Sequence, residues 1–281
     1  MIEAALDAGT VPEAVFVAHD ASTDARVAHC LERVYEVGAS VHYLASGVLE
    51  RVSDTVTPQP IIGIVPFNGS ALADLAVRGG AGAPCESSSP DQSTHSGMHK
   101  DKSLGAESLP GSEASLDCPP SLLIVCIDVR DPGNAGTVLR SAAGAGAAGV
   151  VFSDSSVDPY NPKTVRASAG SIFQVKFVAG GEPASIMDFL SGCGYRLIGT
   201  SSHSGIDYSR ADLMGRVAIV LGNEAGGLPD SVLGLLDQTV TIPLASGVES
   251  LNVGIAGAII CFEAVRQARW GRLQASIAGA A

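Results

Sequence analysis

The sequence contains few aromatic residues and no long apolar run. Aromatic residues make up only 5% of the 281 residues, although hydrophobic residues reach 46%, which suffices for a substantial core rich in alanine and valine. The longest apolar candidate, IAGAIICF at 255–262, stops at Glu263. A membrane-spanning helix requires about 18 to 20 apolar residues, so the pattern argues against such a helix.

The sequence also shows no secretory signal and no paired cysteines. Its first residues, MIEAALDAGTVPE, include neither a basic start nor a long apolar stretch. The six cysteines form no C-x-x-C pair, and Cys126 and Cys261 lie inside apolar runs, where we expect buried thiols. We therefore expect a reduced, cytoplasmic protein without a metal site and without a membrane anchor.

Positive charge is scarce and unevenly placed. The formal net charge of −12 argues against a broad phosphate-binding surface. Residues 1–120 hold 6 Lys/Arg and 16 Asp/Glu, a net charge of −10, whereas residues 121–281 hold 11 and 13, a net charge of −2. A local basic site in the second half of the chain therefore stays open.

Composition divides the chain into two predicted domains and a linker. Residues 79–120 contain no aromatic residue and are dominated by Gly, Pro and Ser, which predicts a flexible linker. His95 and His99 within it have the spacing of a metal-binding pair on a helix, but solvated linker histidines are the simpler interpretation. The predicted domains are residues 1–78 and 121–273.

Hydrophobic patterning predicts α/β structure on both sides of the linker. Before it, we expect strands at 14–20, 41–45 and 61–67 and helices at 24–38 and 46–54. After it, we expect strands at 121–129, 149–154, 173–178, 195–200, 216–222 and 239–244, and helices at 134–147 and about 250–270. Apolar strands without polar alternation are typical of a parallel sheet covered on both faces. A ligand pocket is then expected at the carboxyl ends of the strands.

The first loop with functional candidates is DVRDPGNAGTVLR at 128–140. Asn134 is expected to cap the following helix, and Arg140 lies nearly two turns further on. Both can border a pocket, although a helix cap and a surface arginine would also explain them. The sequence GAGAAG at 144–149 lies at the end of that helix rather than at a strand-to-helix turn, which disfavours a dinucleotide site.

Two further loops carry polar candidates. In AIVLGNEAGGLPD (218–230), a turn and a helix starting near Pro229 explain the glycines and the proline but not Glu224. In IPLASGVESLNV (242–253), Ser250 is expected to cap the last helix. Asn252, just before a buried run, requires a further polar partner.

Taken together, these loops resemble the SpoU-type RNA ribose 2′-O-methyltransferases of the SPOUT superfamily. The pattern of that family is N-x-G-x-x-x-R, then a strand ending in G-x-E-x-x-G-L, then I-P and E-S-L-N-V before an apolar helix. The corresponding stretches are NAGTVLR (134–140), LGNEAGGLP (221–229) and IPLASGVESLNV (242–253). The resemblance covers about 121–270. It implies a C-terminal α/β-knot, that is, a mostly parallel sheet with a trefoil knot, and a homodimer formed through this domain.

Residues 1–78 resemble, more weakly, the small ribosomal-protein-like α/β domain that binds the RNA substrate in this family. Such domains normally have an earlier helix, strand and basic lead, which this chain lacks. We therefore expect a domain truncated at its start, either because the start is mis-assigned or because RNA capture is reduced.

The resemblance implies transfer of a methyl group from S-adenosylmethionine to a ribose 2′-hydroxyl of RNA. Arg140 would be the main catalytic group, because a permanently charged guanidinium can bind phosphate and stabilise a developing alkoxide. Asn134, Glu224, Ser250 and Asn252 would orient Arg140 and the ribose. For Glu224, bracing of the loops is an alternative role.

Further contacts are implied for the cofactor and for RNA. The expected cofactor-binding residues are Gly222, Ile242, Leu244, Leu251 and Thr200, and the expected RNA-binding residues are Arg130 and Arg166. Ribosomal RNA is favoured over tRNA by analogy with the two-domain layout. The alternatives are a tRNA ribose methyltransferase, a catalytically silent RNA-binding protein and a nucleotide-dependent oxidoreductase. The turn DPGNAG lacks the glycine spacing that the last of these requires.

Overall fold

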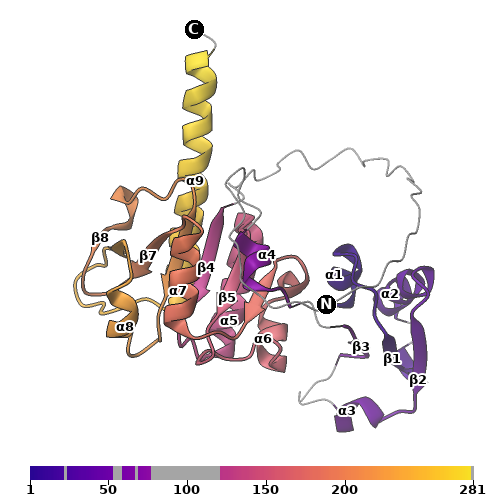
Figure 1. Ribbon diagram of the computed structural model, residues 1–281. Coiled ribbons are helices and arrows are strands. Elements are labelled where there is room, and N and C mark those ends of the chain that lie inside the picture. The colour runs from indigo at the N-terminus through magenta and orange to yellow at the C-terminus, as the bar shows by residue number, and fades with distance from the viewer. Residues whose placement is uncertain (22–23, 53–58, 67–68, 77–120, 280–281) are drawn as a thin grey trace, which may run out of the picture.

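A computed structural model of the chain describes residues 1–21, 24–52, 59–66, 69–76 and 121–279. These residues form a three-stranded sheet in the first part of the chain and a seven-stranded sheet in the second (Figure 1). The predicted linker at 79–120, with His95 and His99, lies outside the described residues.

The smaller sheet belongs to an α/β unit at the start of the chain. Its elements are α1 (Ile2–Asp7), β1 (Ala14–Ala18), α2 (Ala25–Glu36), β2 (Ser40–Leu44), α3 (Val48–Val52) and β3 (Ile61–Ile64). The strand order is β2-β1-β3, with β2 parallel and β3 antiparallel to β1. Asp24 caps α2, because its carboxylate accepts hydrogen bonds from the backbone N–H groups of Arg26 and Val27.

The larger sheet has the order β6-β5-β4-β9-β7-β10-β8, and every neighbouring pair is parallel. Its strands are β4 (Leu122–Cys126), β5 (Gly149–Phe152), β6 (Phe177–Ala179), β7 (Arg196–Thr200), β8 (Ile206–Asp207), β9 (Val217–Leu221) and β10 (Gln238–Thr241). The mostly parallel α/β architecture predicted from the sequence is confirmed.

One predicted strand is largely wrong. Residues 173–178 alternate like a strand, but the chain makes a 3-10 turn, η2 (Ser171–Phe173), and β6 begins only at Phe177. Gly170, in the left-handed region at φ 96, starts this turn. The turn places Ile172 and Val175 in the core. Apolar residues of this segment are therefore buried without forming a strand.

Helices cover both faces of the large sheet. One face carries α5 (Pro132–Ala145), α6 (Pro162–Ala167) and α9 (Val253–Gly279), and the other carries α4 (Leu72–Ala76), α7 (Pro183–Gly192) and α8 (Asp230–Leu233). In β4, Ile124 packs into the first core and Leu123 into the second. Both sides of the strand are therefore buried, which explains its unbroken apolar sequence.

Helix α4 lies on the large sheet although it precedes the predicted linker (Figure 1). Leu75 is fully buried in the core beside α7, and the Arg216 guanidinium donates a hydrogen bond of 3.3 Å to the carbonyl oxygen of Ala76. The next residue that the structure describes is Ser121, whose hydroxyl donates a hydrogen bond of 2.7 Å to the carbonyl oxygen of Gly215. Residues 215–217 therefore form hydrogen bonds with both Ala76 and Ser121. The predicted domain boundaries stay a prediction.

Three observations concern the cysteines, metal binding and membrane crossing. Cys126 and Cys261 are buried, as expected from their apolar surroundings. Among the described residues, no group of three or more His, Cys, Asp or Glu side chains is placed to hold a metal ion. No helix in this part of the chain combines the length and apolar character that a membrane crossing requires.

Candidate active site at the ends of two neighbouring strands

The candidate site begins where β4 ends. Asp131 caps α5, because its Oδ1 accepts a hydrogen bond of 2.9 Å from the backbone N–H of Asn134. The prediction that Asn134 is the cap is therefore wrong: Asn134 lies within the first turn. Its side chain is 7% exposed, so its amide must find hydrogen-bond partners inside the protein.

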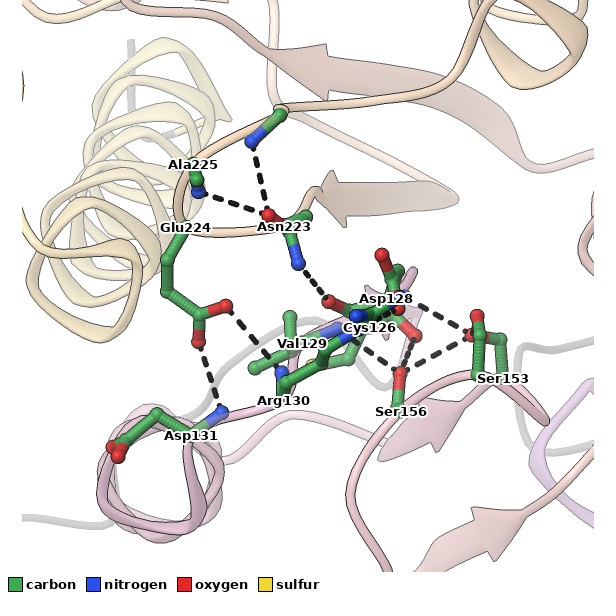
Figure 2. Close-up of polar contacts among 12 residues, drawn as sticks. Cys126, Asp128, Val129, Arg130, Asp131, Ser153, Ser156, Asn223, Glu224 and Ala225 are labelled. Carbon is green, nitrogen blue, oxygen red and sulfur yellow. Dashed lines mark hydrogen bonds and ion pairs between the residues drawn. The ribbon is translucent and has the colours of Figure 1, made fainter.

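The loop after β9 folds back on itself beside this turn. A Cβ at position 222 would lie 2.4 Å from the carbonyl carbon of Gly227, so only glycine permits the close return. Asn223 holds the loop, since its Oδ1 accepts from the backbone N–H groups of Ala225 and Gly226 at 2.9 Å. Its Nδ2 donates to the carbonyl oxygen of Asp128 at 2.9 Å, which joins the loop to the turn after β4 (Figure 2).

Glu224 projects from this loop onto the start of α5. Its Oε1 accepts hydrogen bonds from the Asn134 side chain at 2.8 Å and from the backbone N–H of Asp131 at 3.2 Å. Its Oε2 accepts a longer one, at 3.4 Å, from the backbone N–H of Arg130 (Figure 2). Burial by itself would raise the pKa of Glu224, but the hydrogen bonds from the Asn134 amide and from backbone N–H groups outweigh it and lower the pKa. Glu224 is therefore ionised at neutral pH.

Asn252 extends the network to the third loop. Its Nδ2 donates to Asn134 Oδ1 at 2.6 Å, and its Oδ1 accepts from the backbone N–H of Ile255 at 3.2 Å. An ionised carboxylate can only accept, so Glu224 fixes the orientation of the Asn134 amide, and that amide fixes Asn252. The polar partner expected for Asn252 is confirmed, and it is Asn134.

The same contacts correct the predicted cap of the last helix. Helix α9 begins at Val253, and the side chain of Asn252 accepts from the third residue of the helix. Asn252 rather than Ser250 is therefore the N-cap. Ser250 is exposed and lies before the helix.

Arg140 lies outside this network. It is exposed on α5, three residues after Thr137 and four before Gly144. Those two positions face Gly254 and Phe262 of α9, so the helical repeat places Arg140 on the same side of α5, at the margin of the contact with α9. The structure brings Asn134, Glu224 and Asn252 together and leaves Arg140 and Ser250 exposed.

The residues predicted to contact the cofactor lie at the same edge of the sheet. Thr200 ends β7, Gly222 follows β9 and Ile242 follows β10, and these three strands are neighbours in the order β9-β7-β10. Leu244 and Leu251 are half-buried at the two sides of the exposed stretch 245–250.

Two positively charged side chains lie beside the network, and each is paired with an aspartate. The Arg130 Nε donates to Asp128 Oδ1 at 2.7 Å, while the Lys163 Nζ lies 3.8 Å from Asp131 Oδ2. The hydrogen bond to Asp128 raises the pKa of Arg130. Arg166 is exposed on α6.

Sequence reasoning missed Asp128 and Asn223. Each stands two residues after a buried strand, and that position was the available signal. Their roles depend on contacts between separate loops.

The fold and the three joined loops define a class of protein. The model of the SpoU rRNA Methylase family matches residues 121–262, which is more than half of the chain. The chain belongs to this family.

Individual relatives are similar over the same region. The 23S rRNA (uridine(2479)-2′-O)-methyltransferase of Streptomyces viridochromogenes is 38% identical over 146 residues, 50% of this chain and 51% of the relative. The 23S rRNA (guanosine(2553)-2′-O)-methyltransferase RlmP of Bacillus subtilis is 36% identical over 140 residues, 50% of this chain and 56% of the relative. The chain thus spans about half the length of these curated relatives in the matched region.

Among solved structures, the SpoU methyltransferase AviRb from Streptomyces viridochromogenes, in complex with the cofactor AdoMet, is similar to most of the chain. The likeness has a TM-score of 0.69 at 25% identity and covers 95% of this chain and 87% of that one.

Proposed function

We propose that the protein transfers a methyl group from S-adenosylmethionine to a ribose 2′-hydroxyl of ribosomal RNA. The observation that carries the proposal is the hydrogen-bonded chain Glu224–Asn134–Asn252, which joins the three motif loops at the carboxyl ends of the strands. The names of the family and of relatives that act on 23S rRNA support the class of substrate.

The residues at the sheet edge fit S-adenosylmethionine. Bound there, the cofactor would supply an electrophilic methyl group on a sulfonium centre. Its adenosine and methionine parts carry no phosphate, so an apolar wall and backbone groups suit it better than a cationic cradle. Ile242, Leu244 and Leu251 are half-buried and offer that wall, and the loop after β9 returns closely past Gly222. Thr200 completes the set at the end of β7.

Arg140 is proposed as the catalytic group that binds the RNA at the reacting ribose. Its guanidinium is exposed and stays charged, so it can stabilise the negative charge that develops on the 2′-oxygen. Ser250, exposed in the neighbouring loop, would face the ribose. Asn134 has both ends of its amide engaged, which suits an orienting role rather than proton transfer. Glu224, with three donors on its carboxylate, orients by bracing the loops.

Methyl transfer from radiolabelled S-adenosylmethionine to ribosomal RNA of a deletion strain tests the proposal. Arg140→Ala should abolish transfer and leave the melting temperature and cofactor affinity nearly unchanged, because the side chain is exposed. Arg210→Ala is the matched control, since Arg210 is exposed on the turn η3 (Tyr208–Arg210) next to the edge strand β8. Near-normal turnover by the Arg140 variant, or no transfer by the native protein to either rRNA or tRNA, would refute the proposal.

We also propose a homodimer formed through α9. The second half of this helix extends beyond the sheet (Figure 1) and exposes Trp270 by 56% and Leu273 by 52%, and Phe262, in the first half, is 46% exposed. These residues line an open groove of about 380 Å³ together with Val265, Arg266 and Arg269. Large apolar side chains gathered on one exposed helix suit a self-complementary interface. Sedimentation should give twice the chain mass, and Phe262→Glu should halve it.

Two finer features are proposed on the same likeness to SpoU methyltransferases. The second sheet is proposed to carry the trefoil knot, supported by the fold shared with AviRb. The first unit is proposed to bind the RNA substrate as a small ribosomal-protein-like domain, supported by its own three-stranded sheet and separate core.

A further inference from the structure

Asp128 has a backbone conformation that its side chain disfavours. Its φ of 56° lies in the left-handed region, and among the described residues only Asp128 and Ala169 adopt a positive φ without being glycine. A Cβ makes this region sterically unfavourable, although aspartate and asparagine tolerate it better than most residues. Such strain persists only where the surroundings hold it in place, and it is frequent at functional sites.

Three separate groups hold Asp128. Its backbone N–H donates to Ser153 Oγ at 3.2 Å, and its carbonyl oxygen accepts from Asn223 Nδ2 at 2.9 Å. Its carboxylate accepts from Arg130 Nε at 2.7 Å (Figure 2). Ser153 is itself buried after β5 and is 2% exposed. The two backbone contacts come from the loops after β5 and β9, the strands on either side of β4.

A glycine at position 128 would make both backbone contacts without strain. Compared with glycine, aspartate at this position contributes only its side chain, which accepts a hydrogen bond from Arg130. The backbone N–H of Arg130 faces Glu224 at 3.4 Å. Residue 130 is thus held by its backbone to the Asn134–Glu224 network and by its side chain to Asp128.

The ion pair leaves Arg130 available to a ligand. Its side chain is 71% exposed, against 25% for Asp128. Because Asp128 engages Nε, the two terminal nitrogens of the guanidinium keep their donors for an anion. A phosphate of the RNA backbone matches that planar fork.

We infer that Asp128 is a positioning residue that aims Arg130 at an RNA phosphate next to the target ribose. This inference rests on the proposed function, since it names a further contact of the same site with RNA. It also makes a prediction of unexpected sign. Removing a carboxylate beside an RNA site should tighten binding if simple charge repulsion is its only effect. A positioning role requires the opposite result.

The experiment compares Asp128→Gly, Asp128→Asn and Arg130→Ala with the native chain, and uses Ala169→Gly as the matched control for relief of strain. Both glycine variants should melt at or above the native temperature, because each relieves a positive φ. Of the two glycine variants, only Asp128→Gly should raise KM for RNA, several-fold and with kcat nearly unchanged. Asp128→Asn keeps an acceptor oxygen for Arg130 and should give an intermediate KM.

Two further measurements separate a positioning role from a structural one. Asp128→Gly should add nothing in an Arg130→Ala background, because it acts through Arg130. Arg130→Ala should lower the slope of log K against log salt for RNA binding by about one unit. Tighter RNA binding by Asp128→Gly, or additive effects in the double variant, would overturn the inference.

RNA binding measured by filter retention without cofactor keeps this inference distinct from the proposed function. If the native chain binds RNA and shows these variant effects but transfers no methyl group, the catalytic proposal fails and the positioning of Arg130 stands. If transfer is normal and Asp128→Gly binds and turns over like the native chain, the inference fails alone.

Discussion

The substitution Glu224→Gln tests the hydrogen-bonded network Glu224–Asn134–Asn252 at its carboxylate. The substitution preserves shape but removes the charge, and its amide nitrogen is best accommodated in place of Oε2, where it faces the backbone N–H of Arg130. Two hydrogen bonds then become neutral and the third is lost. Bonds to charged groups contribute about 1.5–3 kcal/mol and neutral ones about 1. After allowance for the partial exposure of Glu224, we expect a loss of about 2 kcal/mol.

For a domain of this size the loss corresponds to a fall in melting temperature of about 4–8 °C. Because the folded-state pKa of Glu224 is lowered below its ordinary value of 4.5, its ionised form stabilises the fold above that value. This stabilisation is lost as pH falls through the lower, folded-state pKa. The melting temperatures of the native chain and Glu224→Gln should therefore differ at pH 7 and converge only as the pH falls below 4.5.

Activity should fall as well, because glutamine no longer dictates which way the Asn134 amide points. Glu182→Gln is the matched control. Glu182 caps α7, and hydrogen bonds from the backbone of Ser185 and Ala184 lower its pKa, but it lies away from the three loops. It should show the same pH signature in melting with full methyl transfer. A Glu224→Gln variant that melts like the native chain at pH 7, or with a pH-independent difference, would refute the reasoning.

Two other predictions concern the loops that the network joins. Gly222→Ala should destabilise the fold by about 2 kcal/mol or more and weaken cofactor binding in calorimetry, since its Cβ would lie 2.4 Å from backbone. Gly226→Ala should do neither, because its nearest neighbour would be the Asn223 side chain at 3.7 Å; equal effects would contradict the steric argument. Asn252→Ala should cost about 1–2 kcal/mol in denaturant unfolding, through loss of the cap and of the bond to Asn134. Ser250→Ala should cost nothing measurable, and the reverse order would restore Ser250 as the cap.

The sequence predicts most of the large sheet, because buried parallel strands leave a local signature. The residues of β4 and β9 are uniformly apolar, and both strands were expected within a few residues of their bounds. The requirement of Asn252 for a polar partner was also visible, because a polar side chain stood directly before a buried helix. Both features can be predicted because they depend on residues that are close together in the sequence.

The remaining features depend on contacts between distant segments. Ser250 and Asn252 are both good caps by residue type, and the hydrogen bond that Asn252 donates to Asn134, 118 positions away, favours Asn252. The turn at Ser171–Phe173 buries apolar side chains that a strand would also have buried. Nothing near Asp128 in the sequence shows that Ser153 and Asn223 hold it in the left-handed region.

The attachment of the chain at Gly215–Val217 changes what the segment between Ala76 and Ser121 can do. The carbonyl oxygen of Ala76 and the hydroxyl of Ser121 are bonded to the adjacent residues Arg216 and Gly215, so both ends of the intervening segment are fastened just before β9. Doubling a loop that closes in this way costs only about 0.6 kcal/mol. The segment is therefore a natural place to insert a reporter domain, because an insertion there should leave the contacts at Ala76 and Ser121, and with them the large sheet, unchanged.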